Sequence, residues 1–177
     1  MKRFFRDHAI SLTLLLILAV MLLIFCFSAQ KAEESNEASE SVVRCLLGIF
    51  YRVFDRLDPR KQLEIQKTVS HYVRKAAHFT EFALLGFSLF LHFRALSSRF
   101  QIPFPAPFSQ LIGSAYAISD ELHQKAVSGR SGQFSDVLLD SFGVLFGILI
   151  LWLLFRFHEW LKKKDCKCAV ERREARQ

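Results

Sequence analysis

Apolar residues along the chain gather into long runs that polar stretches separate. Residues 9–27 form an apolar run that only Ser11 and Thr13 interrupt. At 1.5 Å of rise per residue, a helix over this run is about 28 Å long, close to the hydrocarbon thickness of a bilayer. A second clean run, 144–155, lies toward the other end of the chain. This pattern predicts an integral membrane protein.

Two further apolar stretches are more mixed. Residues 76–93 combine alanine and glycine with aromatic residues, and residues 108–122 include Ser109, Gln110 and Tyr116. By hydropathy alone the latter stretch is too polar to face lipid, but it can cross a membrane if neighbouring helices shield it. We therefore expect an all-α, polytopic membrane fold with four transmembrane helices, at residues 9–27, 76–93, 108–122 and 136–155.

The segments around these spans differ in character. Between Val42 and Leu57, apolar residues recur at helical spacing with basic residues among them, which is typical of a helix lying in the headgroup plane. We expect an amphipathic extracytoplasmic helical segment over residues 42–74 and a proline-containing loop over residues 96–107. The expected domains are a short N-terminus (1–8), a membrane domain (9–155) and a basic tail (156–177).

The distribution of charge bears on orientation. The net charge is +7, and Lys and Arg residues precede the first apolar run and fill the tail. Because four spans put both termini on one side, and because basic flanks favour the cytoplasm, we predict a multi-pass protein of the cell membrane with both termini cytoplasmic. The first run exceeds a signal-peptide core, so we expect an uncleaved anchor. Membrane lipids are expected partners, and nucleic acid is not.

Small residues and cysteines change this picture little. Gly143 and Gly147 form a small-xxx-small pattern that lets another helix approach closely, and a homodimer through this face is one expectation. The four cysteines lack the spacing of a zinc site or a disulfide framework. No motif of decisive spacing names a metal or a cofactor, so both stay open.

Ionisable and polar residues gather at particular ends of the predicted spans. If the chain crosses four times, the end of the first span, the start of the second, the end of the third and the start of the fourth share one side of the membrane. Charges inside a membrane are costly and usually functional, so we predict one extracytoplasmic polar site. Its residues are Gln30, then Lys75, His78 and Glu81, then Asp120 and Gln124, and finally Arg130, Asp136 and Asp140.

Helical spacing puts several of these residues on common faces. Lys75 and His78 are three apart, and Asp136 and Asp140 are four apart. Asp136 can also be a first-turn acid that complements the helix dipole, and Asp140 can belong to a structural ion pair. Arg130, between two glycines, can complete an anion site or simply lie in a tight turn. We expect Glu121 and His123 to point outward or to the headgroups.

Three kinds of chemistry are compatible with such a site. It could bind a phosphate or carboxylate, or run general acid–base chemistry on a lipid or cell-wall precursor. It could also hold a divalent cation through oxygen and imidazole ligands. No nucleophile is evident, and spacing alone does not choose. The cation ligands would come from Glu81, Asp120, Asp136 or Asp140, with His78 as an additional ligand.

Several short motifs, in order, resemble the VanZ-like membrane protein family over about residues 10–154. The motifs are Phe27–Gln30, Arg74–Phe82, Ser119–Gln124, Gly129-Arg130 and Asp136–Asp140. Members of this family are small polytopic bacterial proteins, and the founding one is associated with resistance to the glycopeptide teicoplanin. The resemblance implies a cell-envelope protein that binds or modifies a lipid-linked or cell-wall-related ligand, or a glycopeptide, and lowers teicoplanin susceptibility.

Candidate roles follow from position in the predicted site. Two alternatives remain, a structural or scaffold membrane subunit without catalysis and a small ion-coupled transporter, and whether the protein is an enzyme is open. The candidate catalytic residues are His78, Glu81, Asp120 and Asp140, and the candidate ligand-binding residues are Gln30, Lys75, Gln124, Arg130 and Asp136.

Overall fold

A computed structural model describes residues 2–30, 42, 43, 45, 48, 57–127 and 133–174. Long α-helices account for nearly all of this part of the chain, and no strand occurs in it, which confirms the all-α class. The helices are α1 (Lys2–Ser28), α4 (Pro59–Phe100), α5 (Pro105–Ala126) and α6 (Phe134–Glu174).

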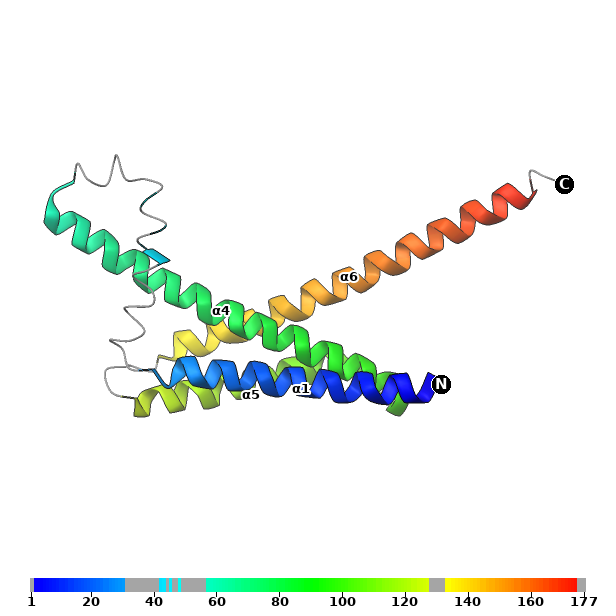
Figure 1. Ribbon diagram of the computed structural model, residues 1–177, viewed down its shortest axis with the longest axis horizontal. Helices are drawn as coiled ribbons and strands as arrows, with labels where there is room; N and C mark the ends of the chain where they lie inside the picture. The colour runs from blue at the N-terminus through cyan, green and yellow to red at the C-terminus, as the bar shows by residue number, and fades with distance from the viewer. Residues whose placement is uncertain are drawn as a thin grey trace.

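The helices pack around a crossing of α4 and α6, which make the most extensive contact in the molecule. α1 lies against α4, and α5 packs on both α4 and α6. The 42 residues of α4 and the 41 of α6 make each helix much longer than a bilayer is thick. The first part of α4 and the last part of α6 therefore extend beyond the bundle, and both chain termini lie toward the same end of the molecule (Figure 1).

Glycines allow the close crossing of α4 and α6. A Cβ atom on Gly143 would meet the carbonyl oxygen of Phe79 at 2.6 Å, and one on Gly147 would collide with the carbonyl oxygen of Ala83. The small-residue face predicted from the sequence thus packs two helices of the same chain. A homodimer through these glycines would compete with this packing.

α1 is apolar on all sides, yet it buries one narrow stripe. Ile17, Val20 and Ile24 face the bundle, with Thr13 and Ser28 at the two ends of the stripe. Most leucines of α1, with Phe25 and Phe27, stay exposed on the outer surface of the bundle, as expected for a helix whose other faces meet lipid. The stripe joins a core that α4 and α6 supply through Phe82, Leu85, Leu89, Val144 and Ile148.

In the part of the chain that the structure describes, three helices are long and apolar enough to cross a membrane, in the segments His8–Ser28, Pro59–Ser97 and Phe134–Lys164. This supports a membrane protein. The predicted fourth crossing, over 108–122 in α5, does not meet the same standard of length and composition. The mean hydropathy of α5 is too low, because it includes the polar residues that this helix turns toward the other helices.

Several predicted boundaries differ from those of the structure. α4 begins after Asp58, whose side chain accepts a hydrogen bond from the backbone N–H of Arg60 at 2.8 Å, and it runs unbroken through the expected second span. It ends where Gln101 adopts a left-handed conformation, so the loop before α5 is shorter than predicted. Much of the tail continues α6. Of the amphipathic segment, residues 44, 46, 47 and 49–56 lie outside the described part.

Candidate functional site

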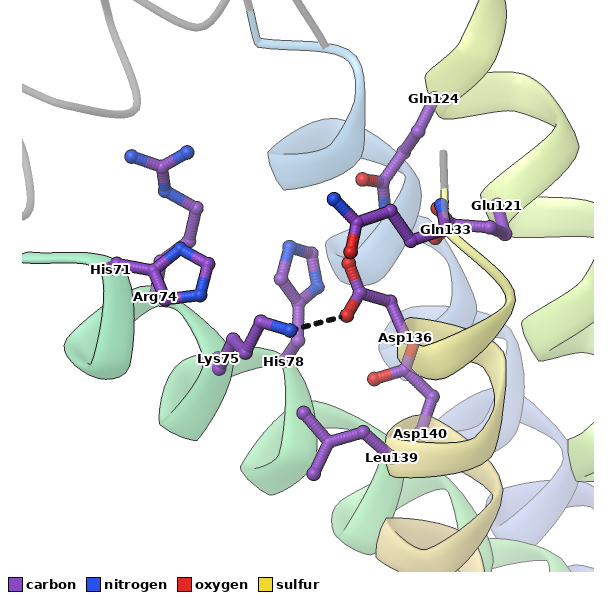
Figure 2. A pocket seen from close by; sticks show the side chains of 10 residues that line it. All are labelled: His71, Arg74, Lys75, His78, Glu121, Gln124, Gln133, Asp136, Leu139 and Asp140. Atoms are coloured by element: carbon purple, nitrogen blue, oxygen red, sulfur yellow. Dashed lines mark hydrogen bonds and ion pairs between the residues drawn. The ribbon is translucent and has the colours of Figure 1, made fainter. Parts of the chain in front are cut away.

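A cavity of about 150 Å³ opens where α4, α5 and α6 converge (Figure 2). It lies between the first half of α4, the last turns of α5 and the first turns of α6. Every lining residue except Leu139 has a polar or ionisable side chain, which is unusual within a membrane protein and marks the place for a functional site. The lining residues are His71, Arg74, Lys75, His78, Glu121, Gln124, Gln133, Asp136, Leu139 and Asp140.

The wall contributed by α4 consists of groups that can carry positive charge. His71, Arg74, Lys75 and His78 follow the spacing i, i+3, i+4 and i+7, which places them on one face of a helix. Figure 2 shows these four side chains on one side of the cavity, opposite the acidic residues of α6.

The opposite wall is acidic, and one ion pair bridges the two walls. Nζ of Lys75 lies 2.6 Å from Oδ1 of Asp136, and both side chains keep 30% of their surface exposed (Figure 2). The backbone N–H of Asp136 donates to the carbonyl of Gln133 at 2.9 Å in the first turn of α6. Asp136 therefore both complements the helix dipole and takes part in the cavity wall.

Below this pair, the floor of the cavity contains polar atoms without partners. Asp140 is 2% exposed, and its Oδ1 atom has no hydrogen bond within the described residues. Nδ1 of His78 lies 3.5 Å from Oε2 of Glu81, near enough for an ion pair with a protonated ring, but neither atom has a hydrogen bond there. Buried polar atoms rarely stay unpaired, so such a cluster points to a missing ligand or water.

Asp120 is equally buried but fully engaged. It is 4% exposed, and its Oδ2 atom accepts hydrogen bonds from Oγ of Ser28 at 2.9 Å and from Nε2 of Gln124 at 2.8 Å. Tyr116, one turn earlier, donates to the carbonyl of Met21 at 2.7 Å. These contacts join α1 to α5 and hold Gln124 at the edge of the cavity, so Asp120 supports the cavity without lining it.

The prediction that Glu121 and His123 point outward is wrong. Glu121 is buried, lines the cavity and accepts a hydrogen bond from the backbone N–H of Gln133. The ring of His123 stacks on Phe25 of α1, with centroids 4.8 Å apart. Both residues follow the inward face of α5, because the helix turns its polar side toward its neighbours and its apolar side away from them.

The structure brings together most, though not all, of the predicted site residues. Lys75, His78, Gln124, Asp136 and Asp140 line the cavity. Glu81 lies beside His78, and Asp120 lies behind Gln124. Gln30, just beyond α1, is not among the lining residues, and Arg130 falls outside the described residues.

Five lining residues are absent from the predicted set: the apolar Leu139 and the polar His71, Arg74, Glu121 and Gln133. The helical period offers a signal for two of them, because His71 and Arg74 share a face with Lys75 and His78. Glu121 lies four residues after Ala117 and three before Gln124, so the helical period also places it on their face. Gln133 precedes the first helical residue of α6, and no periodic pattern reaches it.

A cation site has less support than an organic ligand site. Among the described residues, no three His, Cys, Asp or Glu side chains are grouped so that they could hold a metal ion. Asp136, one of the predicted metal ligands, already forms an ion pair with Lys75. Positive and negative walls facing each other suit a ligand that carries complementary charges of its own.

Comparison with known proteins identifies one family. The VanZ/LLP1 family model matches residues 13–156, which include every lining residue of the cavity and the crossing of α4 with α6. No curated protein and no solved structure shows significant similarity to the chain.

Proposed function

The chain belongs to the VanZ/LLP1 family, and we propose that it acts in the cell envelope by holding the polar end of a lipid-linked or cell-wall-related ligand. The cavity between α4, α5 and α6 is the proposed binding site. The observation that carries this proposal is the meeting, in one cavity of a membrane protein, of a cationic wall, an acidic wall and a floor with unpartnered buried atoms.

The size of the cavity favours a small polar group over a whole antibiotic. Pockets for drug-sized ligands usually measure about 300–1,000 Å³, whereas this cavity measures about 150 Å³. A headgroup or the polar end of a precursor fits such a volume, and a complete glycopeptide does not. We propose that a lowered teicoplanin susceptibility arises through the envelope ligand, and that the drug itself stays outside the cavity.

Separate roles are proposed for the site residues. Lys75, Gln124 and Asp136 contact the ligand at the walls, and Gln30 and Arg130 stay candidate ligand-binding residues from the sequence. An acid–base step would use the two titratable groups of the floor, His78 and Asp140. Glu81 would orient the His78 ring, and Asp120 would hold Gln124.

The proposed membrane arrangement has four crossings, with the cavity extracytoplasmic and both termini cytoplasmic. Support for the fourth crossing comes from the outer face of α5, which exposes Phe108, Leu111, Ile112, Ile118 and Leu122 while its small and polar residues face inward. Its 22 residues make a helix of about 33 Å, enough to cross a bilayer. The basic ends of the chain favour the cytoplasm.

Drug susceptibility tests the proposed function. We expect Asp140→Asn and His78→Ala each to return the teicoplanin susceptibility of expressing cells to that of cells without the protein, because each removes a floor group. Membrane levels of both variants should equal wild type. Glu159→Gln, on the same helix as Asp140 but far from the cavity, is the matched control and should behave as wild type. Unchanged susceptibility in both floor variants would reject the role.

A structural role is the second candidate, and the surroundings of Asp120 favour it at one point. This side chain, with Ser28 and Gln124, forms a buried hydrogen-bonded connection between α1 and α5 that needs no ligand. A scaffold should lose stability with every polar substitution in the cavity. A binding site often keeps or gains stability when its groups are neutralised, because it trades stability for function.

A further inference from the structure

Resting on the proposed function, we propose that the ligand is zwitterionic: the headgroup of an aminophospholipid, with its phosphate at the mouth of the cavity beside Arg74 and His71 and its primary ammonium group at the floor beside Asp140. Phosphatidylethanolamine is the simplest lipid with this chemistry. The proposal names the ligand class that the cavity would select, and it stands on the order of charges along the cavity.

Exposure decreases in parallel along both walls. On α4, His71 is exposed, Arg74 and Lys75 are half-buried, and His78 lies deeper. On α6, exposure falls from Gln133 through Asp136 to Asp140. The cavity therefore has a mouth at His71 and Arg74 and a floor at His78 and Asp140.

The floor requires a hydrogen-bond donor. Oδ1 of Asp140, which is 2% exposed, is a buried acceptor without a hydrogen-bond partner in the described residues. Oε2 of Glu81, beside the floor but not lining it, also has no hydrogen-bond partner there, although Nδ1 of His78 lies 3.5 Å away. A buried carboxylate without a partner costs several kcal/mol, and a cation with N–H groups is the complement that removes the cost. An anionic ligand at this depth would add a further acceptor beside Asp140.

The mouth supplies donors for a phosphate. Lys75 is engaged by Asp136 at 2.6 Å, so the positive charge at the mouth comes from Arg74 and, when protonated, His71. A guanidinium group has five N–H donors in a fixed fork and can bind a phosphate with two of them while others serve a second partner. Arg74 at the mouth and Asp140 at the floor therefore place a positive group and a negative group at different depths of the cavity.

Charge and volume agree with this assignment. Among the described lining residues, with the histidines neutral, two cations, Arg74 and Lys75, face three carboxylates, Glu121, Asp136 and Asp140. A zwitterionic ligand adds no net negative charge to this site, whereas a purely anionic ligand adds to the excess. The cavity of about 150 Å³ is smaller than the usual pocket for a drug-sized molecule and suits the polar end of a lipid.

The experiment measures lipid binding to the purified full chain by native mass spectrometry. The probes are phosphatidylethanolamine, phosphatidylcholine and phosphatidylglycerol with identical acyl chains, and free O-phosphoethanolamine. Phosphatidylcholine keeps the positive charge but has no N–H donor, and phosphatidylglycerol has no ammonium group. We expect phosphatidylethanolamine to bind at least about tenfold more tightly than the other lipids, because hydrogen bonds to charged groups are among the strong ones.

Two variants separate the floor from the mouth. Asp140→Asn should bring the affinity for phosphatidylethanolamine down to that for phosphatidylcholine, while binding of the phosphate remains. Arg74→Gln should weaken all three lipids by a similar factor and leave their ranking unchanged. Glu159→Gln is the control and should bind as wild type. An unchanged preference for phosphatidylethanolamine in a folded Asp140→Asn protein would overturn the proposal.

The outcomes distinguish this inference from the proposed function. Binding of phosphatidylglycerol as tight as that of phosphatidylethanolamine would overturn the zwitterionic ligand while the cavity remained an anion site. Binding of free O-phosphoethanolamine as tight as that of the lipid would contradict the proposal that the ligand is a lipid. If no lipid binds and the floor variants leave drug susceptibility unchanged, both the inference and the proposed function fail.

Discussion

At the residue scale, two carboxylates show how differently equal burial can be used. Asp120, 4% exposed, accepts hydrogen bonds from Ser28 and Gln124, whereas Asp140, 2% exposed, keeps Oδ1 unpartnered in the described residues. The first group stabilises the packing of α1 on α5. The second has an acceptor atom that no described residue pairs with, so a ligand with an N–H or O–H donor can bind there.

The two carboxylates should therefore respond differently to substitution. Asp120→Ala leaves two buried donors without their acceptor and should lower the free energy of unfolding by about 1–3 kcal/mol. Asp140→Asn neutralises a buried carboxylate whose Oδ1 has no hydrogen-bond partner in the described residues, and it should leave stability unchanged or raise it. Thermal and denaturant unfolding in detergent measures both. A loss in Asp140→Asn as large as that in Asp120→Ala would favour the structural role over the binding site.

At the scale of elements, the fold depends on how closely α4 and α6 cross. The backbone of Ala83 occupies the space that a side chain at Gly147 would need, and Gly86 meets the backbone of Val144 in the same way. Backbone atoms cannot rotate aside as a flexible side chain can. The crossing in turn sets the distance between the walls of the cavity, since Lys75 and Asp136 lie on these two helices.

We expect Gly147→Ala to push α4 and α6 apart. The loss of stability should be about 1–3 kcal/mol, the usual cost of overpacking a close contact, and the separation should also weaken the ion pair of Lys75 with Asp136. Leu145→Ala, at a side chain that is 48% exposed on the same helix, is the control and should cost less. Thermal unfolding in detergent provides the measurement, and wild-type stability in Gly147→Ala would contradict the crossing.

At the scale of the whole molecule, the alternating direction of the helices brings the helix ends that form the cavity to one place. The end of α1 and the end of α5 meet the early part of α4 and the start of α6, while both termini lie toward the other end (Figure 1). If α5 crosses the membrane like its neighbours, the cavity opens on one side only.

Labelling of single cysteines tests this topology. In a background with all four native cysteines replaced by serine, Phe104→Cys and Ala126→Cys place a thiol at each end of α5. A membrane-impermeant thiol reagent added to intact cells should label Ala126→Cys, and it should label Phe104→Cys only after permeabilisation. Labelling of both from the same side would show that α5 does not cross.

The sequence by itself determined the helical class, the membrane setting and the faces on which Lys75, His78, Asp136 and Asp140 lie. These follow from the helical period and from the length of apolar runs, which are local properties of the chain. The period also linked His71 and Arg74 to the face of His78, whereas nothing in the sequence marked Gln133 as a cavity residue.

The tertiary structure decided which of those faces meet. Only the close crossing of α4 and α6 at glycines, and the turning of the polar side of α5 inward, bring Glu121 into the cavity and Asp120 under Ser28. The angle and depth at which helices cross depend on contacts between residues distant in the chain. A periodic pattern within one helix carries no information on them, and so it cannot separate an engaged carboxylate from an unpartnered one.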